Sequence, residues 1–372
     1  MLKEINKINN ISYTVKRNPI LSVIINEIEY KIQTIGDVHL GKSFKTGVPY
    51  HKLGEREQSQ LQLLEQLLAP VDSTTIAVIL MGDLFDKAIV SNNVVKDFYN
   101  LITVAAENNP LVSYIILDGN HVLSKENTKT TSFDILTLLL EDVKNINVVN
   151  KNQVVEIVPN LHLYLDCYDP YNSYSSVEEI VLSEIKQDKN NTLISFGHWD
   201  TFEFTETGYY PNQHILSYSD LTCSGHIHIP MEYTYNYVNK ESGISLKGKT
   251  LITGSMQPYS HSEDPEKLLY ITIKSNELDK YNLSEDFKNK CVRIDCDSLF
   301  ILSEPIDCLS LTLRVVETKK EQVAIETADE SVEEVSENFN LALIKKVETF
   351  QDVETITKQE LLDLLKNKTY LD

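Results

Sequence analysis

Five short stretches of the sequence carry side chains that commonly bind divalent metals. Each stretch begins with a run of apolar residues, continues with glycine, and then places an acid, an amide or an imidazole directly after it. The side chains concerned are Asp37 with His39, Asp83, Asn120 with His121, His198, and His226 with His228. Short apolar runs bounded by glycine are typical of buried strands, and open α/β folds bind ligands beyond the carboxyl ends of parallel strands. The pattern therefore predicts one site at the edge of a sheet.

The donor set indicates which metals this site would take. Two carboxylates, one amide oxygen and four imidazoles suit Mn²⁺, Fe²⁺ or Zn²⁺ better than Ca²⁺ or Mg²⁺. Seven ligands exceed the need of one tetrahedral ion, so two metals that share a carboxylate are expected. Two divalent cations against two carboxylates leave a positive site that attracts a phosphate group. A metal-activated water would then attack phosphorus in line, and His121, which coordination does not require, is placed to protonate the leaving oxygen.

Each stretch taken alone has a plainer explanation. An aspartate after glycine at a strand end is more often a turn or a helix cap, and a buried histidine is more often satisfied by a backbone carbonyl. His226 and His228 have a stronger claim, because residues two apart in an extended segment share a face. The recurrence of all five stretches, each after an apolar run, outweighs these alternatives.

Composition excludes several classes of protein. The 372 residues are 42% hydrophobic and 24% charged, as expected of a globular chain, and the formal net charge is −21. That charge argues against broad nucleic-acid binding through a basic face, although bound cations would supply local positive charge. No apolar run approaches the roughly 18 residues of a membrane span, and the polar N-terminus is not a secretory signal. The five scattered cysteines fit reduced thiols in the cytoplasm.

The order of strands and helices predicts a layered α/β fold. Helical periods occur at 55–68, 92–107, 132–140 and 177–185, and β-like runs alternate with them. We expect a flexible N-terminal extension at 1–19 and a catalytic domain at 20–275 that includes a strand at 268–273. A small capping domain and an acidic linker are expected at 276–337, and a helical tail at 338–372.

The motif series resembles that of the calcineurin-like metallophosphoesterases. The flanking residues of Asp37-Val38-His39-Leu40-Gly41 and of Gly82-Asp83-Leu84-Phe85-Asp86 are similar to those of the SbcD-type DNA repair nucleases. Phe196-Gly197-His198-Trp199, Ser224-Gly225-His226-Ile227-His228 and Gly254-Ser255-Met256-Gln257-Pro258 look closest to the recombination endonuclease subunits of T-even-type phages. The resemblance covers about residues 30–270. It implies a two-sheet αββα sandwich with a small capping domain.

The resemblance also implies roles for individual residues. One metal would be held by Asp37, His39, Asp83 and His228, and the second by Asp83, Asn120, His198 and His226, so that Asp83 bridges both. His121 matches the catalytic histidine of the family, and Asp86 supports the ligands without coordinating a metal. Val122 departs from the acid that usually follows the Asn-His pair. The basic side chains after the first and third motifs are candidates for DNA-backbone contacts: Lys42, Lys45, Arg56 and Lys125.

The implied function is a Mn²⁺-dependent DNA exo- and endonuclease that works in the cytoplasm of a phage-infected bacterial host. Its implied partners are DNA, an SMC-like ATPase bound through the C-terminal helices, and a second copy bound through the helices near 92–107 and 132–140. Two alternatives remain open. One is a metallophosphoesterase that acts on phosphoproteins or nucleotides. The other is a non-catalytic scaffold that anchors the ATPase, although the presence of all seven ligands argues against a lost site.

Overall fold

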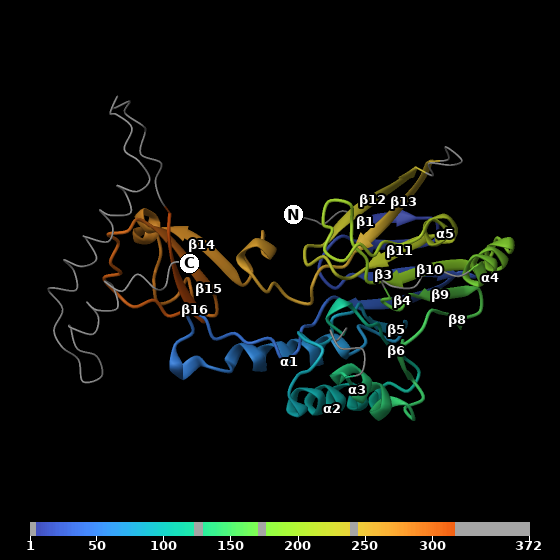
Figure 1. The fold of residues 1–372 in the computed structure, drawn as a ribbon, viewed down its shortest axis with the longest axis horizontal. Helices are drawn as coiled ribbons and strands as arrows, with labels where there is room; N and C mark the ends of the chain where they lie inside the picture. The colour runs from blue at the N-terminus through green and yellow to red at the C-terminus, as the bar shows by residue number, and fades with distance from the viewer. Residues whose placement is uncertain (1–4, 123–128, 170–175, 239–244, 317–372) are drawn as a thin grey trace, which may run out of the picture. The chain divides into compact units, whose positions relative to one another are not determined.

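The first sheet contains the strands that precede three of the metal-binding motifs. The computed structural model describes residues 5–122, 129–169, 176–238 and 245–316. Within them, seven strands run in spatial order from β1 to β7 (Figure 1). They are β1 (Ile5–Ile8), β2 (Ile11–Thr14), β3 (Ile20–Ile25), β4 (Ile28–Ile35), β5 (Thr75–Leu80), β6 (Ser113–Ile116) and β7 (Ile146–Val148). The strands from β1 to β4 pair antiparallel and those from β4 to β7 pair parallel. The carboxyl ends of β4, β5 and β6 therefore meet at one edge.

A two-residue hairpin turn joins β3 to β4 in this sheet. Residues Asn26 and Glu27 join β3 to β4 and have φ angles of 49° and 69°. Two successive residues with positive φ are the geometry of a two-residue hairpin turn whose twist matches that of the strands. This turn sends β4 toward Asp37.

The second sheet contains the strands that precede the remaining motifs. Its order is β12-β13-β11-β10-β9-β8. The strands are β8 (Gln153–Val158), β9 (Leu161–Leu165), β10 (Thr192–Gly197), β11 (Leu221–Ser224), β12 (Met231–Val238) and β13 (Ser245–Ile252). β9, β10, β11 and β13 are parallel, whereas β8 and β9 form an antiparallel pair. The carboxyl ends of β10 and β11 again share one edge.

Helices cover the outer faces of the two sheets, which confirms the αββα sandwich (Figure 1). α1 (Glu55–Leu68), α2 (Asn92–Asn108) and α3 (Ser132–Leu140) pack on the first sheet, and α4 (Ser176–Gln187) and α5 (Gln213–Tyr218) pack on the second. The inner faces meet in a core that includes Ile32, Ile79, Leu163 and Phe196, all fully buried. Burial of such side chains stabilises the sandwich by roughly 1.5–3 kcal/mol each.

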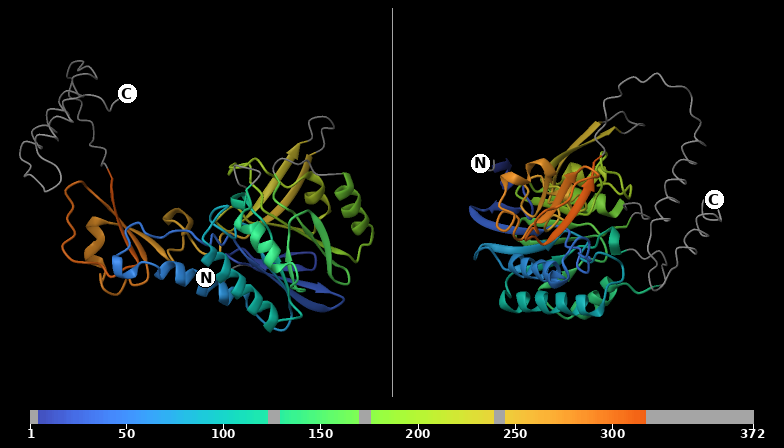
Figure 2. Two further views of the ribbon diagram at one scale, coloured as in Figure 1. Left: turned by 60° about the horizontal axis from the view of Figure 1, so that its bottom comes forward. Right: turned by 90° about the vertical axis from the view of Figure 1, so that its left-hand side faces the viewer.

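A third, smaller sheet follows the sandwich. Its parallel strands β14 (Tyr270–Lys274), β15 (Cys291–Cys296) and β16 (Ser310–Val315) enclose their own core around Phe287 and Ile294. The expected boundary at residue 276 is corrected by this pairing, because β14 pairs with β15 and not with the second sheet. The backbone N–H of Leu311 donates to the carbonyl oxygen of Gly47 at 2.8 Å, so the third sheet contacts the segment before α1 (Figure 2).

The expectation of a flexible extension at 1–19 is wrong for residues 5–19. β1 and β2 extend the first sheet, and Ile11 and Tyr13 are buried against the inner core. The Tyr13 hydroxyl donates to Glu232 of β12 at 2.9 Å. The alternation of Ile11, Ser12, Tyr13 and Thr14 is a short period-two pattern, and its apolar half faces the core.

Several expectations fall on parts of the chain that the structure does not describe. The helical tail, most of the acidic linker and Lys125 lie outside the described residues. Within the described residues, no helix has the length and apolar character needed to cross a membrane.

Candidate metal centre

The two sheets bring the predicted ligands together at their carboxyl edges. Asp37 follows β4, Asp83 follows β5, and Asn120 and His121 lie in a short 3-10 turn after β6. His198 follows β10, and His226 and His228 follow β11. Asp37 also forms a parallel bridge with Ser255, which follows β13. Loops from both sheets therefore meet at one site, and all seven predicted ligands belong to it.

The first ligand group consists of Asp37, His39 and His228. One donor atom from each lies within 4.8 Å of the others. The Nε2 atoms of His39 and His228 face each other at 3.0 Å, and His228 Nε2 lies 3.5 Å from Asp37 Oδ2. Two imidazole nitrogens and a carboxylate oxygen at such distances form one side of a coordination sphere.

The second ligand group consists of Asp83, His198 and His226, again with donor atoms within 4.8 Å of one another. Asn120 joins it, because its Oδ1 lies 3.0 Å from His198 Nε2. His198 Nε2 also lies 3.4 Å from Asp83 Oδ2. The same Asp83 oxygen lies 4.0 Å from His39 Nε2 in the first group. Asp83 therefore stands between the two groups, as the bridging position requires.

His121 lies beside this bridge. Its backbone N–H donates to Asp83 Oδ1 at 3.0 Å, and its Nε2 is 3.8 Å from Asp83 Oδ2. The Nδ1 atom lies 2.6 Å from the carbonyl oxygen of Asp86, to which it is placed to donate. His39, Asp83 and His121 also form a third group of close donors. Of these three side chains, His121 is the most exposed, at 33%.

Other groups orient the histidines from outside. His198 Nδ1 lies 3.0 Å from the carbonyl oxygen of Met81, and His228 Nδ1 lies 3.1 Å from Glu263 Oε2. His226 Nε2 lies 2.6 Å from Asp200 Oδ1, which leaves its Nδ1 as the nitrogen available to a metal. An acceptor on the far nitrogen of a ligating histidine sets its tautomer and its ring orientation. These contacts are those expected around a metal centre.

Two buried carboxyl groups lie close together at this site, an arrangement that favours the binding of a cation. Burial, followed by the nearby charge of Asp83, raises the pKa of Asp37 well above its usual value. Burial also opposes ionisation of Asp83, but the imidazoles of His198, His39 and His121 outweigh it and hold the pKa of Asp83 low. Among the described residues, Asp37 Oδ2 is buried and has no hydrogen-bond partner. A buried carboxylate oxygen without a partner is costly, so the donor set fits divalent metal ions.

The backbone at the centre is strained where ligands are presented. His39, Asp83 and His226 have φ angles of 50°, 43° and 72°. Side-chain-bearing residues adopt this left-handed region at a cost of about 1–3 kcal/mol, and such strain gathers at functional sites. The N–H of His39 donates to the Asp83 carbonyl oxygen at 2.8 Å, which holds the first two motifs together.

Glycine is required where the loops approach most closely. A Cβ on Gly225 would lie 2.2 Å from the carbonyl oxygen of Met81, and one on Gly119 would lie 2.3 Å from Asp83 Oδ1. Both contacts are shorter than atoms tolerate. The glycine that precedes the ligand in these two motifs is therefore a packing requirement of the site.

The predicted supporting and DNA-contacting residues have different environments. Asp86 Oδ1 lies 3.7 Å from His39 Nδ1 and accepts from Lys42 Nζ at 3.2 Å, so Asp86 is adjacent to the ligands without joining them. Lys45 is exposed. Val122 packs against the core of the first sheet, and the carbonyl oxygen of Asp86 contacts His121 instead of the acid that the resemblance implies.

The expectation that Arg56 contacts DNA is wrong. Arg56 is 6% exposed and donates to the Tyr270 hydroxyl at 2.7 Å. Its guanidinium also lies 4.0 Å from the centre of the Phe44 ring. Arg56 therefore joins α1 to the third sheet from a buried position, which the DNA backbone does not reach.

Sequence reasoning missed two carboxylates and an arginine at the site. Asp200 and Glu263 orient His226 and His228, and Arg17 contacts the loop that carries His228. Asp200 carried a weak signal, since it comes two residues after His198. Neither Glu263 nor Arg17 belongs to a motif, so only their positions in space reveal them.

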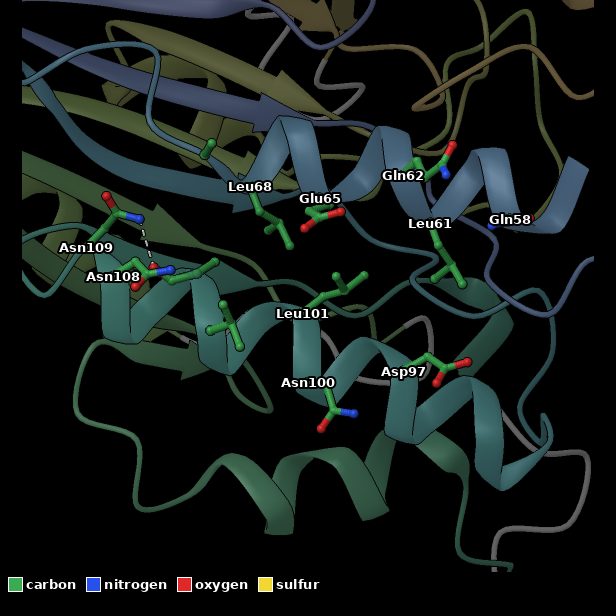
Figure 3. A pocket seen from close by; sticks show the side chains of 13 residues that line it. Gln58, Leu61, Gln62, Glu65, Leu68, Asp97, Asn100, Leu101, Asn108 and Asn109 are labelled. Carbon is green, nitrogen blue, oxygen red and sulfur yellow. Dashed lines mark hydrogen bonds between the residues drawn. The ribbon is translucent and has the colours of Figure 1, made fainter. Parts of the chain in front are cut away.

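Within the described residues, one hollow lies near the metal centre and another lies beside α1. One, of about 600 Å³, is lined by His226, His228 and Glu263 together with the loop 203–206. The other, of about 580 Å³, lies between α1 and α2, where Leu61 and Leu101 extend toward the space between the helices (Figure 3). The second hollow contains no candidate ligand. The first hollow therefore lies beside two of the candidate ligands, His226 and His228.

A fold and a site of this kind define a metal-dependent phosphoesterase. The family profile of the calcineurin-like phosphoesterases matches residues 30–230, more than half of the 372 residues. The chain belongs to this family. No curated protein matches the chain.

Proposed function

We propose that the chain is a two-metal DNA exo- and endonuclease, and the nuclease subunit of a recombination or repair complex. One observation supports the two-metal reading above all others. Asp83 Oδ2 lies 4.0 Å from an imidazole nitrogen of the first ligand group and 3.4 Å from one of the second. A single carboxylate between two sets of nitrogen donors is the arrangement that a pair of ions uses. The mixed oxygen and nitrogen donors suit Mn²⁺, Fe²⁺ or Zn²⁺. Of these we propose Mn²⁺, which the resemblance to the SbcD-type nucleases implies.

Bound divalent cations would activate a water molecule and neutralise charge on a phosphoester. The chain's own residues would hold these cations, orient the imidazoles and transfer a proton. Asp37 and Asp83 would hold the cations, and the Met81 carbonyl, Glu263 and Asp200 keep the imidazoles in place. His121 presents Nε2 beside Asp83 while its Nδ1 faces the carbonyl oxygen of Asp86. From there it delivers a proton to the leaving oxygen.

The choice of DNA as substrate rests on the sequence around the ligands. The stretches at Asp37–Gly41 and Gly82–Asp86 resemble those of the SbcD-type nucleases. Lys42 lies close to Asp86 and stays one-third exposed, and Lys45 is exposed. These two lysines support the proposal, because phosphate contacts position a nucleic acid without reading its sequence.

The proposed partners are DNA, an SMC-like ATPase and a second copy of this chain. The proposed surface for the second copy lies on α3, where Ile135, Leu138 and Leu139 are 40%, 70% and 48% exposed. Adjacent exposed apolar side chains are a common mark of protein interfaces. The ATPase would bind the segment 338–372.

The experiment compares substrates at fixed Mn²⁺. Purified wild type and Asp83→Asn are incubated with linear double-stranded DNA, single-stranded DNA, a nitrophenyl phosphodiester and a phosphopeptide, with and without the ATPase. We expect wild type to degrade DNA and Asp83→Asn to be slower by at least about 100-fold. The matched control is Asp72→Asn, because Asp72 is an exposed carboxylate that pairs with Lys31.

The rival functions give different results in the same assay. Hydrolysis of the phosphopeptide or the nitrophenyl ester with no DNA degradation would leave a phosphoesterase but refute the nuclease. If wild type and Asp83→Asn were equally inactive on all substrates with the ATPase present, the non-catalytic scaffold would be the correct function.

A further inference from the structure

The segment between β2 and β3 contacts the metal centre, although the motifs begin only at Asp37. The backbone N–H of Asn18 donates to the carbonyl oxygen of Thr253 at 3.3 Å. The side chain of Asn18 accepts from the Gly36 N–H at 2.9 Å and donates to the Met256 carbonyl oxygen at 2.8 Å. Asn18 therefore ties the residue before ligand Asp37 to the loop after β13.

Arg17 makes the more direct contact with a ligand. Its Nη1 donates to the carbonyl oxygen of His228 at 2.7 Å. The same nitrogen donates to the carbonyl oxygen of Ser255 at 3.1 Å and to Ser255 Oγ at 2.6 Å. Its Nη2 donates to the carbonyl oxygen of Glu263. One guanidinium thus joins the loop after β11 to two parts of the loop after β13.

The acceptors of Arg17 are the residues that determine the position of one imidazole. Glu263 Oε2 lies 3.1 Å from His228 Nδ1, on the ring nitrogen that faces away from Asp37 and His39. Arg17 therefore holds both the backbone of His228 and the backbone of the residue that orients its ring. The second ligand group, by contrast, is oriented by Met81 and Asp200. Among the described residues, Arg17 forms hydrogen bonds with neither of them.

We propose that Arg17 is a positioning residue for the metal subsite of Asp37, His39 and His228, an inference that rests on the proposed metal centre. Its planar fork of donors satisfies several acceptors at fixed angles, which a single ammonium group does not reproduce. Outer residues that orient metal ligands typically change metal affinity by about 10- to 100-fold. The segment before β3 is thereby part of the active site, in addition to its role in the sheet.

The test measures Mn²⁺ binding and not activity alone. Arg17→Ala and Arg17→Lys are compared with wild type and with Lys16→Ala, the neighbouring cation, by calorimetric titration and by electron paramagnetic resonance of bound Mn²⁺. We expect Arg17→Ala to weaken one of two binding steps by about 10- to 100-fold and to leave the other unchanged. Arg17→Lys should fall between wild type and Arg17→Ala, and Lys16→Ala should match wild type.

A double-variant comparison separates positioning from general destabilisation. If Arg17 acts through His228, adding Arg17→Ala to His228→Ala causes no further loss of Mn²⁺ affinity. Thermal unfolding of the metal-free variants checks that each one folds, and Arg17→Lys serves if Arg17→Ala does not. Equal weakening of both binding steps, or an additive loss in the double variant, would overturn the proposal. Absence of Mn²⁺ binding by wild type would instead overturn the proposed function.

Discussion

At the scale of single residues, several structural constraints meet at Asp83. Its carboxylate faces both ligand groups, its backbone adopts φ of 43°, and its carbonyl oxygen accepts from the N–H of His39. Burial alone would favour the neutral acid, yet three imidazoles keep the pKa low.

Asp200 provides a prediction at the same scale. Its carboxylate is fully buried and lies 2.6 Å from His226 Nε2, so Asp200→Asn removes the charge that orients this ring. We expect Mn²⁺ affinity at one of the two proposed sites to fall by about 10- to 100-fold, as measured by calorimetric titration.

Glu206 is the matched control for Asp200. It lies 3.9 Å from the same His226 nitrogen, but its side chain is 71% exposed. Exposed pairs contribute about 0–1 kcal/mol, so Glu206→Gln should bind Mn²⁺ nearly as wild type does. Equal effects of the two substitutions would show that long-range charge, and not the buried contact, governs affinity.

At the scale of elements, short strands and loops determine the site. The hairpin of β1 and β2 adds two strands to the first sheet and leads directly into Arg17 and Asn18. The buried face of α1 carries one residue in every four, namely Arg56, Gln60, Leu64 and Leu68. Gln60 Nε2 donates to the carbonyl oxygen of Val38 at 2.5 Å, so the same helix supports the first motif.

The exposed face of α3 carries the prediction at this scale. Leu138 is 70% exposed, so Leu138→Glu should leave the fold intact and abolish self-association if α3 forms the dimer. Burying an unpaired charge in an interface costs several kcal/mol, enough to lower the dimer population below detection at micromolar concentration. Sedimentation velocity over a range of concentrations measures the effect.

The control for Leu138 is Leu299→Glu, since Leu299 is 86% exposed in the segment before β16. This variant should sediment as wild type does. A wild-type chain that stays monomeric at every concentration, or a dimer that Leu138→Glu leaves intact, would contradict the assignment of the interface to α3.

At the scale of the whole molecule, the proposed function requires an acidic chain to bind DNA, which is itself an acidic polymer. The net charge of −21 opposes the approach of DNA. Two divalent cations at the meeting edge of the sheets would place positive charge where the phosphodiester must react. Binding of DNA should therefore depend on metal ions and on partners more than on a basic surface.

The C-terminal segment carries the prediction at this scale. A chain truncated after Val335 should lose co-purification with the proposed SMC-like ATPase but keep the two proposed Mn²⁺ ions, because all predicted ligands precede residue 317. Co-expression with affinity capture measures the first property, and metal analysis of the captured chain measures the second. Capture of the ATPase by the truncated chain would refute the assignment of the partner site to 338–372.

The sequence by itself determined the layered fold, the limits of α1 and α3, and which candidate metal-binding residues follow the strands. It did so because hydrophobic period and strand-end glycines are local signals, and parallel strands bring their carboxyl ends to one edge. Val122 also signalled locally that the residue after His121 would not orient it.

Only the tertiary structure decided which residues support the ligands. Arg56 has the positive charge and the N–H donors of a phosphate-binding residue. The face of α1 on which it lies is nevertheless buried against Phe44 and Tyr270. Arg17 and Glu263 are 246 positions apart and meet because strands distant in the chain end at a common edge. Contacts of this kind depend on how sheets pack, and no local pattern encodes them.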